Sequence, residues 1–390
     1  MKHFLIFGSH PLLSHAEATA ILAQTPLLAG KSMAIFETET WDGEVLQSRL
    51  AGITKLGDIL YEMPLNNVSL EELADWTLRQ HTAGKLHFGF TVYGGTDAQR
   101  IRVENFALPF KRLLQASHLP VRWVTGKEGK VSPAAVDKLN LTEEGYDFVF
   151  GIIDQTVYIG RTTHVQDATA WSTRDYGRPF RDTKTGMLPP KLARLMINLG
   201  CQTYDPATLT ILDPFCGGGT VLMEATLLHV GHIIGSDIDA RQVQGSENNA
   251  DWLVDQRIIT QEQRERITLL TASVQKIGHD LAGTEVDVIV TEGYLGHPRQ
   301  GNETTLFLNK QKQEIEKLWI ETLTACATLQ PRGSRMICIW PTYVTKTTNV
   351  EIDVSDRLNE LGYQKIQTEA LVYGRDDQHI KRQIIILERL

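Results

Sequence analysis

The segment Leu209-Thr-Ile-Leu-Asp-Pro-Phe-Cys-Gly-Gly-Gly-Thr220 carries the clearest structural signal in the chain. An apolar run typical of a buried strand passes through a glycine turn into a segment of helical character, Gly219–Val230. Glycines are needed where a backbone takes a positive φ or approaches a ligand closely. A second apolar run, His232-Ile-Ile-Gly-Ser-Asp237, ends in an acid about 20 residues after Gly217, a spacing that suits a carboxylate accepting hydrogen bonds from ribose hydroxyls. Together these features predict a nucleotide-like ligand at the glycine turn.

The same alternation continues beyond this stretch and predicts a layered α/β domain. The strand-like runs are Leu209–Asp213, His232–Asp237, Ile267–Ala272, Val286–Glu292 and Arg335–Trp340, and the helical segments include Gly219–Val230, Ala240–Val254 and Leu306–Leu329. Such alternation is typical of a parallel sheet covered by helices on both faces. The last two runs, Lys365–Tyr373 and Lys381–Leu387, are too close for a crossover and should be antiparallel neighbours. We therefore expect a Rossmann-like sheet of five parallel strands that ends in an antiparallel hairpin, with its ligand at the carboxyl ends of the strands.

The N-terminal half has a different, α+β pattern. Strands are predicted at Lys2–Gly8, Leu86–Tyr93, Asp147–Ile153 and Thr156–Gly160, and helices at Ser14–Ala23 and Asn105–Ser117. Ser14 is a candidate N-cap, with Glu17 three residues later completing a capping box. A chain of 390 residues suggests two to three domains. We place the boundary in the linker 161–173, which gives residues 1–165 and 171–390.

Composition restricts the class of protein. No apolar run approaches the length of a membrane helix, and the apolar start of the chain is too short for a signal peptide. The four cysteines show no metal-ligand spacing, so we expect a reduced, cytoplasmic, metal-free protein. The net charge is −8, yet bases outnumber acids from Leu86 to Lys130 and from Arg161 to Arg194. These two stretches fit phosphate-backbone docking and ordinary solvated surface equally well.

The glycine turn also restricts the kind of ligand. It lacks the Gly-Lys-Ser/Thr ending of a P-loop and the G-x-G-x-x-G spacing of a dinucleotide site. Asp213, at the end of the first strand, would repel a pyrophosphate but could pair with the ammonium group of a methionine moiety. Electrostatics therefore favour S-adenosylmethionine as the cofactor.

Two segments carry a resemblance to a known family. The glycine stretch with Gly235-Ser-Asp-Ile-Asp239, and Thr173-Arg-Asp-Tyr-Gly-Arg-Pro-Phe-Arg-Asp182 with Gly186-Met-Leu-Pro-Pro-Lys-Leu-Ala193, resemble THUMP-containing tRNA guanosine N2-methyltransferases. The resemblance covers 171–294 well. It is looser over the start of the chain, where a ferredoxin-like piece and a THUMP-type RNA-binding region would lie.

The resemblance implies an enzyme that uses S-adenosylmethionine and acts on RNA, most simply tRNA, and it leaves room for an accessory protein subunit. By the same resemblance Asp213, Gly217 and Gly219 would contact the methionine end, Asp237 the ribose, and Ile238 the adenine. The full set of expected cofactor-binding residues is Met187, Asp213, Phe215, Gly217, Gly219, Thr220, Asp237, Ile238 and Ser273. Ser273 stands where the family usually has an acid for the adenine amine. Cys216, inside the loop, is expected to be a packing residue, because methylation of an amine needs no enzyme nucleophile.

The catalytic position departs from the family pattern. Amino-methyltransferases of this kind usually carry Asp/Asn-Pro-Pro-Tyr/Phe after the fourth strand, whereas this chain has Val290-Thr-Glu-Gly-Tyr-Leu-Gly-His-Pro298. A conjugated exocyclic amine is a poor nucleophile, so an acceptor must hold its hydrogens while the flipped base stacks on an aromatic ring. Glu292 takes the acidic position, and Tyr294 could supply the ring one position early. Gly293 should make the loop more flexible than a proline pair would.

The sequence therefore supports three functions. The first is an RNA methyltransferase acting on the N2 amine of a guanosine, most simply in tRNA, with Glu292 and Tyr294 as catalytic residues. The second is a DNA adenine or cytosine amino-methyltransferase, which shares the chemistry and the loop. The third is a non-catalytic RNA-binding protein with a degenerate site, suggested by the altered loop at Glu292–Leu295.

Overall fold

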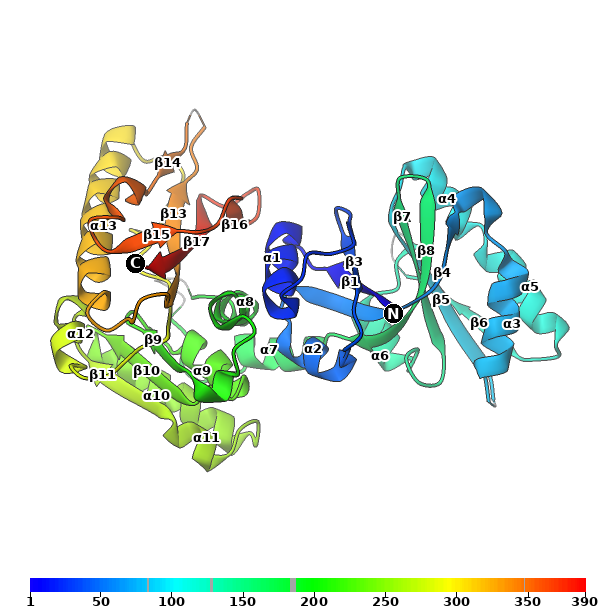
Figure 1. Ribbon diagram of the computed structural model, residues 1–390, viewed down its shortest axis with the longest axis horizontal. Helices are drawn as coiled ribbons and strands as arrows, with labels where there is room; N and C mark the ends of the chain where they lie inside the picture. Colours follow the sequence, from blue (N-terminus) through cyan, green and yellow to red (C-terminus); the bar gives the residue numbers. More distant parts are fainter. Residues whose placement is uncertain (83, 127–128, 183–186, 347) are drawn as a thin grey trace. The chain divides into compact units, whose positions relative to one another are not determined.

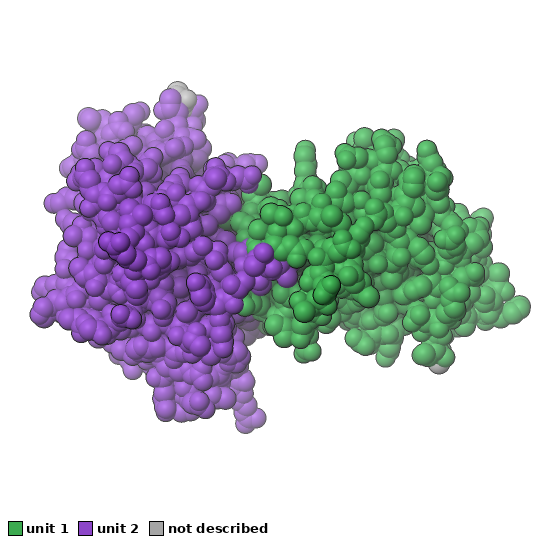
Figure 2. Space-filling model, in the orientation of Figure 1, with its two compact units in different colours: residues 1–19, 24–170 green, residues 20–23, 171–390 purple. Residues whose placement is uncertain are grey.

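The computed structural model describes residues 1–82, 84–126, 129–182, 187–346 and 348–390. Lys127 and Lys184 of the two basic stretches, and Gly186 of the resemblance segment, lie outside the described residues. The chain divides into two compact units, residues 1–19 with 24–170 and residues 20–23 with 171–390 (Figure 2). Among the described helices, none combines the length and apolarity that crossing a membrane requires.

The N-terminal unit is built on one eight-stranded mixed sheet, in the order β2-β3-β1-β4-β8-β7-β5-β6. Its strands are β1 (Lys2–Phe7), β2 (Leu28–Ala29), β3 (Met33–Glu37), β4 (Ile53–Pro64), β5 (Leu86–Gly94), β6 (Val121–Val124), β7 (Tyr146–Ile153) and β8 (Thr156–Val165). Its helices are α1 (Pro11–Leu22), α2 (Gly43–Arg49), α3 (Leu70–Gln80), α4 (Asp97–Glu104), α5 (Ala107–Ala116) and α6 (Pro133–Lys138), with α7 (Ala168–Tyr176) leading into the second unit (Figure 1). The strands expected at the chain start and around residues 86–160 are confirmed.

The predicted cap of the first helix is wrong. The helix begins at Pro11, so Ser14 lies inside it, and the Ser14 hydroxyl donates to the carbonyl oxygens of His10 and Gly52. Glu17 is fully buried and accepts the backbone N–H groups of Ala51 and Gly52 at 2.8 and 2.7 Å. The spacing of Ser14 and Glu17 is that of a local capping box, but both side chains bond to residues distant in the sequence. Spacing alone cannot distinguish a local cap from such long-range contacts.

The C-terminal unit contains the second sheet, whose main path runs β11-β10-β9-β12-β13-β17-β15. Its strands are β9 (Thr210–Asp213), β10 (His232–Asp237), β11 (Ile267–Thr271), β12 (Val288–Thr291), β13 (Arg335–Tyr343), β14 (Val350–Glu351), β15 (Tyr363–Lys365), β16 (Leu371–Tyr373) and β17 (Ile380–Arg389). Its helices are α8 (Pro190–Cys201), α9 (Thr220–Leu227), α10 (Ala240–Asp255), α11 (Gln261–Glu265), α12 (Val274–Asp280) and α13 (Thr305–Cys326).

The sheet confirms the predicted topology in its main features. Strands β11, β10, β9, β12 and β13 are parallel, and β17 pairs antiparallel with β13. The continuous strand expected at Lys365–Tyr373 is wrong, because β15 and β16 pair separately with β17. Between them the side chain of Gln367 donates to the carbonyl of Ile384 and accepts from the N–H of Ile386. An amide side chain there replaces two backbone ladder bonds, which interrupts the strand without leaving the edge unpaired.

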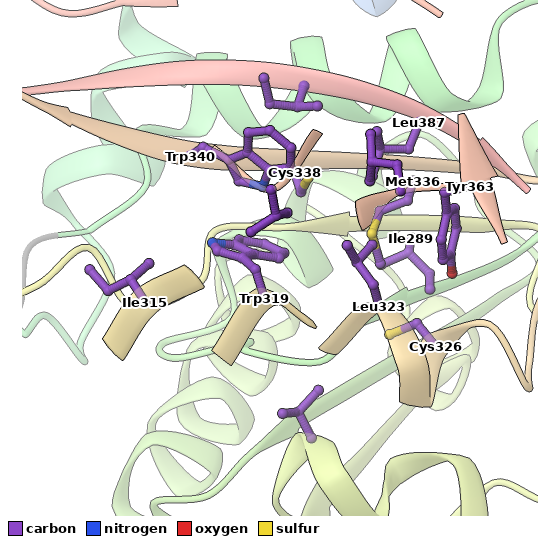
Figure 3. Packing of buried hydrophobic residues seen from close by; sticks show 14 of the residues in the cluster. Ile289, Ile315, Trp319, Leu323, Cys326, Met336, Cys338, Trp340, Tyr363 and Leu387 are labelled. Atoms are coloured by element: carbon purple, nitrogen blue, oxygen red, sulfur yellow. The ribbon is translucent and has the colours of Figure 1, made fainter. Parts of the chain in front are cut away.

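Helices cover both faces of this sheet, as the alternation predicted. Neighbouring residues of β12 point to opposite faces: a Cβ added at Gly200 of α8 would meet Val288, whereas Ile289 joins a buried cluster with Trp319 of α13. In Figure 3 Trp319, Leu323 and Cys326 extend from α13 towards the strands. The carboxyl ends of the five parallel strands are therefore left to the connecting loops, which carry the candidate site.

Candidate active site

The glycine turn after β9 is folded against the end of β10. The two strands are parallel neighbours, with Gly235 opposite Asp213. Gly217 has φ +50° and Gly219 has φ +77°, values that an L-residue with a side chain adopts only with strain. The carboxylate of Asp237 accepts the N–H of Gly217 at 3.0 Å and the N–H of Asp239 at 3.0 Å. Asp237 thus orients the turn itself, in addition to the ribose contact expected of it.

Helix α10 supports the glycine turn from behind. Ser246 Oγ donates to the carbonyl of Gly217 at 2.6 Å, and Asn249 Nδ2 donates to the carbonyl of Gly218 at 2.8 Å. A Cβ added at Gly219 would lie 2.9 Å from Ser246 Oγ, so the third glycine is required by close packing. Ser246 and Asn249 could not be predicted, because polar residues inside a helix give no sequence signal that they face a loop.

The Arg-Pro-Phe-Arg-Asp segment packs beside the same turn. Asn249 also accepts the N–H of Phe180 at 2.9 Å and donates to its carbonyl at 3.0 Å. The buried guanidinium of Arg178 donates to Thr220 Oγ1 at 2.6 Å, with its Nη2 lying 3.7 Å from the sulfur of Met187. This segment therefore fixes the start of α9 and the position of Met187.

The acceptor loop begins where β12 ends. The carboxylate of Glu292 accepts from Arg382 of β17, with Arg382 Nε 2.5 Å from Oε1 and Nη2 3.4 Å from Oε2. Both side chains are largely buried, at 12% and 13% exposure respectively. Arg382 stands 90 residues from its partner in the sequence, and no motif marked it.

An aromatic residue beneath the loop packs closely against Gly293. A Cβ added at Gly293 would lie 3.0 Å from Cζ2 of the buried Trp319, which also packs edge-on against Phe215 with ring centroids 6.3 Å apart. Trp319 therefore contacts the cofactor turn and the acceptor loop at once. The expected looseness at Gly293 is opposed by this packing and by Tyr343, whose hydroxyl donates to the carbonyl of Leu295 at 3.0 Å.

Further along, Arg299 and Glu303 fasten the loop to the strand ends. Glu303 accepts from Arg299 Nη2 at 3.0 Å and from the N–H of Gln300 at 2.6 Å. Burial raises the pKa of Glu303, but these hydrogen bonds and the charge of Arg299 outweigh it and bring the pKa to about 2. Arg299 Nη1 donates to the carbonyls of Val344 and His379. These side-chain contacts restrict the conformation of the loop, as the rigid rings of a proline pair would.

One cavity of about 480 Å³ joins the cofactor turn to the acceptor loop. Its walls include all but one of the residues expected to bind cofactor or to act in catalysis, namely Met187, Asp213, Phe215, Gly217, Thr220, Asp237, Ile238, Ser273, Glu292 and Tyr294. The exception is Gly219, which lies against Ser246 instead. Asp182, Asp239 and Gln242 also line the cavity and were missed, although Asp182 ends the segment that carries the resemblance.

Asp213 is a buried acid of the cavity, and its pKa is strongly shifted. Its carboxylate is buried, accepts from Thr291 Oγ1 at 2.6 Å and accepts from the N–H of Phe215 at 3.1 Å. Burial, with a smaller effect of the charges on Asp237 and Glu292, raises the pKa of Asp213 to about 7 despite these two hydrogen bonds. A carboxyl poised near neutrality in a cavity is a functional candidate, because a cation placed beside it would restore its charge.

Two further groups have simple roles. Burial raises the pKa of the Cys216 thiol well above its usual value, so the thiol stays neutral and packs against Ser246, as expected. Tyr294 is 48% exposed, and its ring meets His297 edge-on with centroids 6.1 Å apart. The cavity therefore has an exposed aromatic ring beside its acidic acceptor.

Among the described residues, no group of three or more His, Cys, Asp or Glu is placed to hold a metal ion.

Comparisons with known proteins agree with this geometry. Residues 178–296 match the UPF0020 family model, described as an RMKL-like methyltransferase domain. The chain is similar to the tRNA (guanine(10)-N2)-dimethyltransferase of Methanothermobacter thermautotrophicus, with 41% identity over 24% of this chain and 26% of the relative. It is similar to the protein of the same name from Methanocaldococcus jannaschii, with 32% identity over 48% of this chain and 47% of the relative. The chain thus spans about half, or less, of the length of these curated relatives.

Among solved structures, the chain is similar to the crystal structure of TrmN from Thermus thermophilus, with a TM-score of 0.55, 16% identity and 100% of both chains covered. At 16% identity this similarity supports the fold alone. The sheet order, the glycine turn and the match over 178–296 lead to one conclusion: the chain carries an RMKL-like methyltransferase domain on a Rossmann-like methyltransferase fold.

Proposed function

We propose that this protein transfers a methyl group from S-adenosylmethionine to the N2 amine of a guanosine in tRNA. The observation that carries the proposal is the single cavity that holds Asp213 and Asp237 of the cofactor strands together with Glu292 and Tyr294 of the acceptor loop. The curated relatives named as tRNA guanine-N2 methyltransferases support the choice of base and of RNA.

The described residues fit the cofactor. Asp213, with its pKa raised to about 7, suits an ammonium group, and Asp237 ends β10 where ribose hydroxyls would be bound. Ile238 is 75% exposed beside the cavity, so it offers an apolar face for an adenine ring. Ser273 stands before α12 and makes no capping hydrogen bond, which leaves its hydroxyl for the adenine edge.

When bound, S-adenosylmethionine supplies an electrophilic methyl group on a positively charged sulfur. The residues of this chain then have to position a weak nucleophile. Glu292 would accept an N–H of the guanine amine and Tyr294 would stack on the base. On methylation the amine would form the new N–C bond as the S–C bond breaks, and Glu292 would accept the proton that the amine loses and pass it to solvent. The positive charge of the sulfur would thus be replaced by one released proton, so charge would balance.

For the remaining parts of the chain we propose residues 1–165 as a ferredoxin-like and THUMP-type region that binds RNA, and residues 171–390 as the methyltransferase domain. The exposed bases of the two basic stretches would contribute phosphate contacts, which makes RNA affinity fall with added salt. We also propose a cytoplasmic location, because the proposed substrate is tRNA, and we include an optional accessory subunit.

The test is transfer of a tritiated methyl group from S-adenosylmethionine to host RNA and, in parallel, to host DNA. The proposal expects label in the tRNA fraction, and loss of that label in the Glu292→Ala variant. Preferential labelling of duplex DNA would favour an adenine or cytosine amino-methyltransferase. Binding of tRNA without label in any nucleic acid would identify a non-catalytic RNA-binding protein.

A further inference from the structure

The Glu292–Arg382 ion pair is the feature that the proposed function leaves unexplained. Arg382 approaches the carboxylate from β17 and donates to both oxygens, at 2.5 and 3.4 Å. Each carboxylate oxygen has two acceptor positions, so one guanidinium leaves acceptor capacity on both oxygens. Glu292 lines the cavity. The pair therefore presents a fixed carboxylate with two oxygens available to a ligand.

Other titratable groups lie near the Glu292–Arg382 pair. The titratable groups around the pair are Asp213 at the end of β9, Tyr294 in the loop, and Tyr373, which stands opposite Arg382 in the β16–β17 ladder. Asp213 senses the charge of Glu292, so the two carboxyl groups repel each other when both are ionised. Arg382 supplies the opposite charge. Burial lowers the pKa of Arg382, but the charge and hydrogen bonds of Glu292 outweigh it, so the guanidinium stays protonated.

An ionised carboxylate has a definite preference among nucleobases, because it accepts hydrogen bonds and cannot donate one. Guanine presents two donors side by side, N1–H and the N2 amine, which match two carboxylate oxygens as a guanidinium does. Adenine and cytosine each place their exocyclic amine beside a ring nitrogen that carries a lone pair. That lone pair would face an anionic oxygen.

We propose that Glu292, held in place by Arg382, reads the paired N1–H and N2–H donors of guanine and rejects adenine and cytosine at the acceptor end of the cavity. Arg382 acts through Glu292 and is a positioning residue. The inference rests on the proposed function, which it deepens by assigning the choice of base to one ion pair.

The probe is 2-aminopurine, which keeps the amine of guanine at the same carbon but has a bare lone pair at N1. tRNA transcripts would carry either guanine or 2-aminopurine at the position that the protein methylates. We expect the parent protein to prefer guanine by about 10²-fold or more in kcat/KM, because a site built around a donor rejects an analogue that lacks it.

In Glu292→Gln this preference should fall about tenfold, since the amide can donate to the bare N1 while its oxygen accepts from the amine. The absolute rates fall for both transcripts, and the ratio is the measurement. A merely structural effect of the substitution would lower both rates and leave the ratio unchanged.

Arg382→Gln separates the two roles within the pair. Without the guanidinium, the Glu292 carboxylate loses the two contacts that fix its orientation, so it should match the N1–H and N2–H donors less well. The guanine preference should therefore fall in Arg382→Gln, by less than the loss expected for Glu292→Gln. Arg382→Lys keeps the charge but offers no planar two-point contact, so it should keep only part of the preference. Arg357→Gln, which removes an exposed arginine paired with Glu360, is the control.

Equal rates on guanine and 2-aminopurine in the parent would overturn the inference, and so would a ratio that Glu292→Gln leaves unchanged. A guanine preference that Arg382→Gln leaves unchanged would overturn the role of Arg382. A parent protein that methylates no tRNA contradicts the proposed function instead. In that case binding still decides the Arg382 step: guanosine 5′-monophosphate should bind the parent more tightly than the 2-aminopurine ribonucleotide and lose that advantage in Arg382→Gln, and an unchanged ratio of affinities would refute it.

Discussion

Both units of the molecule bury charged side chains, and the two burials differ in what surrounds the charge. In the N-terminal unit, Lys55 and Asp147 are fully buried and their side chains meet at 2.7 Å. The Lys55 ammonium also donates to the carbonyl of Val131, and Asp147 accepts from Thr91 and Thr162. In the C-terminal unit, Asp213 and Glu292 face a cavity of about 480 Å³.

The difference separates structural from functional charge. A buried pair whose remaining hydrogen-bonding positions are filled by the chain has nothing left for a ligand. Asp213 keeps a pKa of about 7 and Glu292 keeps acceptor capacity, both beside an open cavity. Changes to the first pair should therefore cost stability, and changes to the second group should cost binding or turnover.

The largest effect is expected at the structural pair. Lys55→Met should lower the stability of the N-terminal unit by about 3–5 kcal/mol, because it leaves the Asp147 carboxylate buried without its counter-charge. Hydrogen exchange resolved by peptide would measure it, with protection lost over β5 and β7 and retained over β9 and β12.

The double variant Lys55→Met, Asp147→Leu is the matched control. It removes both charges and should recover part of the lost stability. Equal exchange in the parent and in Lys55→Met would mean that the ion pair contributes no more than an exposed one.

Glu292→Ala should reduce turnover by about 10²-fold while cofactor affinity stays nearly unchanged, since the residue serves the acceptor. Asp237→Ala should do the opposite and weaken cofactor binding, because it removes the carboxylate that orients Gly217 and would bind the ribose. Single-turnover rates and equilibrium dialysis would measure the two quantities. The reverse pattern would exchange the roles assigned to these two acids.

The raised pKa of Asp213 predicts a pH dependence with a definite sign. In the unliganded protein the neutral carboxyl is favoured, so its contribution to stability is fully present below the unfolded pKa and is lost as the pH rises through about 7. A cationic ammonium favours the ionised form. Cofactor affinity should therefore increase by about tenfold between about pH 5.5 and about pH 7, with release of a proton, and then level off.

Calorimetric titration in two buffers with different ionisation enthalpies would count that proton. Asp213→Asn should bind more weakly and without this pH dependence. An affinity that falls as the pH rises over the same interval would show that Asp213 does not pair with the ammonium group.

The smallest effect is expected at Gly293. Gly293→Ala would place a Cβ 3.0 Å from Trp319 Cζ2 and should cost about 1 kcal/mol through overpacking. Proline at this position should therefore lower activity, although the family pattern has proline there. Trp319→Phe should relieve the strain of Gly293→Ala, so the measured double-variant loss should be less than the sum of the single losses. Additive losses would remove Trp319 as the reason for this glycine.

Much of the C-terminal unit could be predicted from its sequence, because its signals are local. The strand ends at Asp213 and Asp237 are where the apolar periods placed them. The resemblance is confirmed over residues 178–296 by the family match. The gathering of widely spaced residues into one cavity follows from parallel strands, whose carboxyl ends share one edge of the sheet.

The partners of these residues could not be predicted, because they depend on register between distant strands. Arg382 reaches Glu292 only because β17 pairs antiparallel with β13, which in turn neighbours β12. Trp319, which packs against Gly293, lies in the middle of α13. The apolar face of that helix has the sequence pattern of ordinary core, so it gave no sign of this contact. Gln367 breaks a run that has the composition of one strand, since its amide replaces backbone donors and acceptors.

We propose that one cavity brings a methyl donor to the N2 amine of guanosine. The most direct measurement is mass spectrometry of nucleosides from host tRNA incubated with the protein and deuterated-methyl S-adenosylmethionine. We expect N2-methylguanosine carrying the labelled methyl group with the parent protein and its loss with Glu292→Ala. Label on the amine of adenosine or cytidine instead, or undiminished N2-methylguanosine with Glu292→Ala, would contradict it.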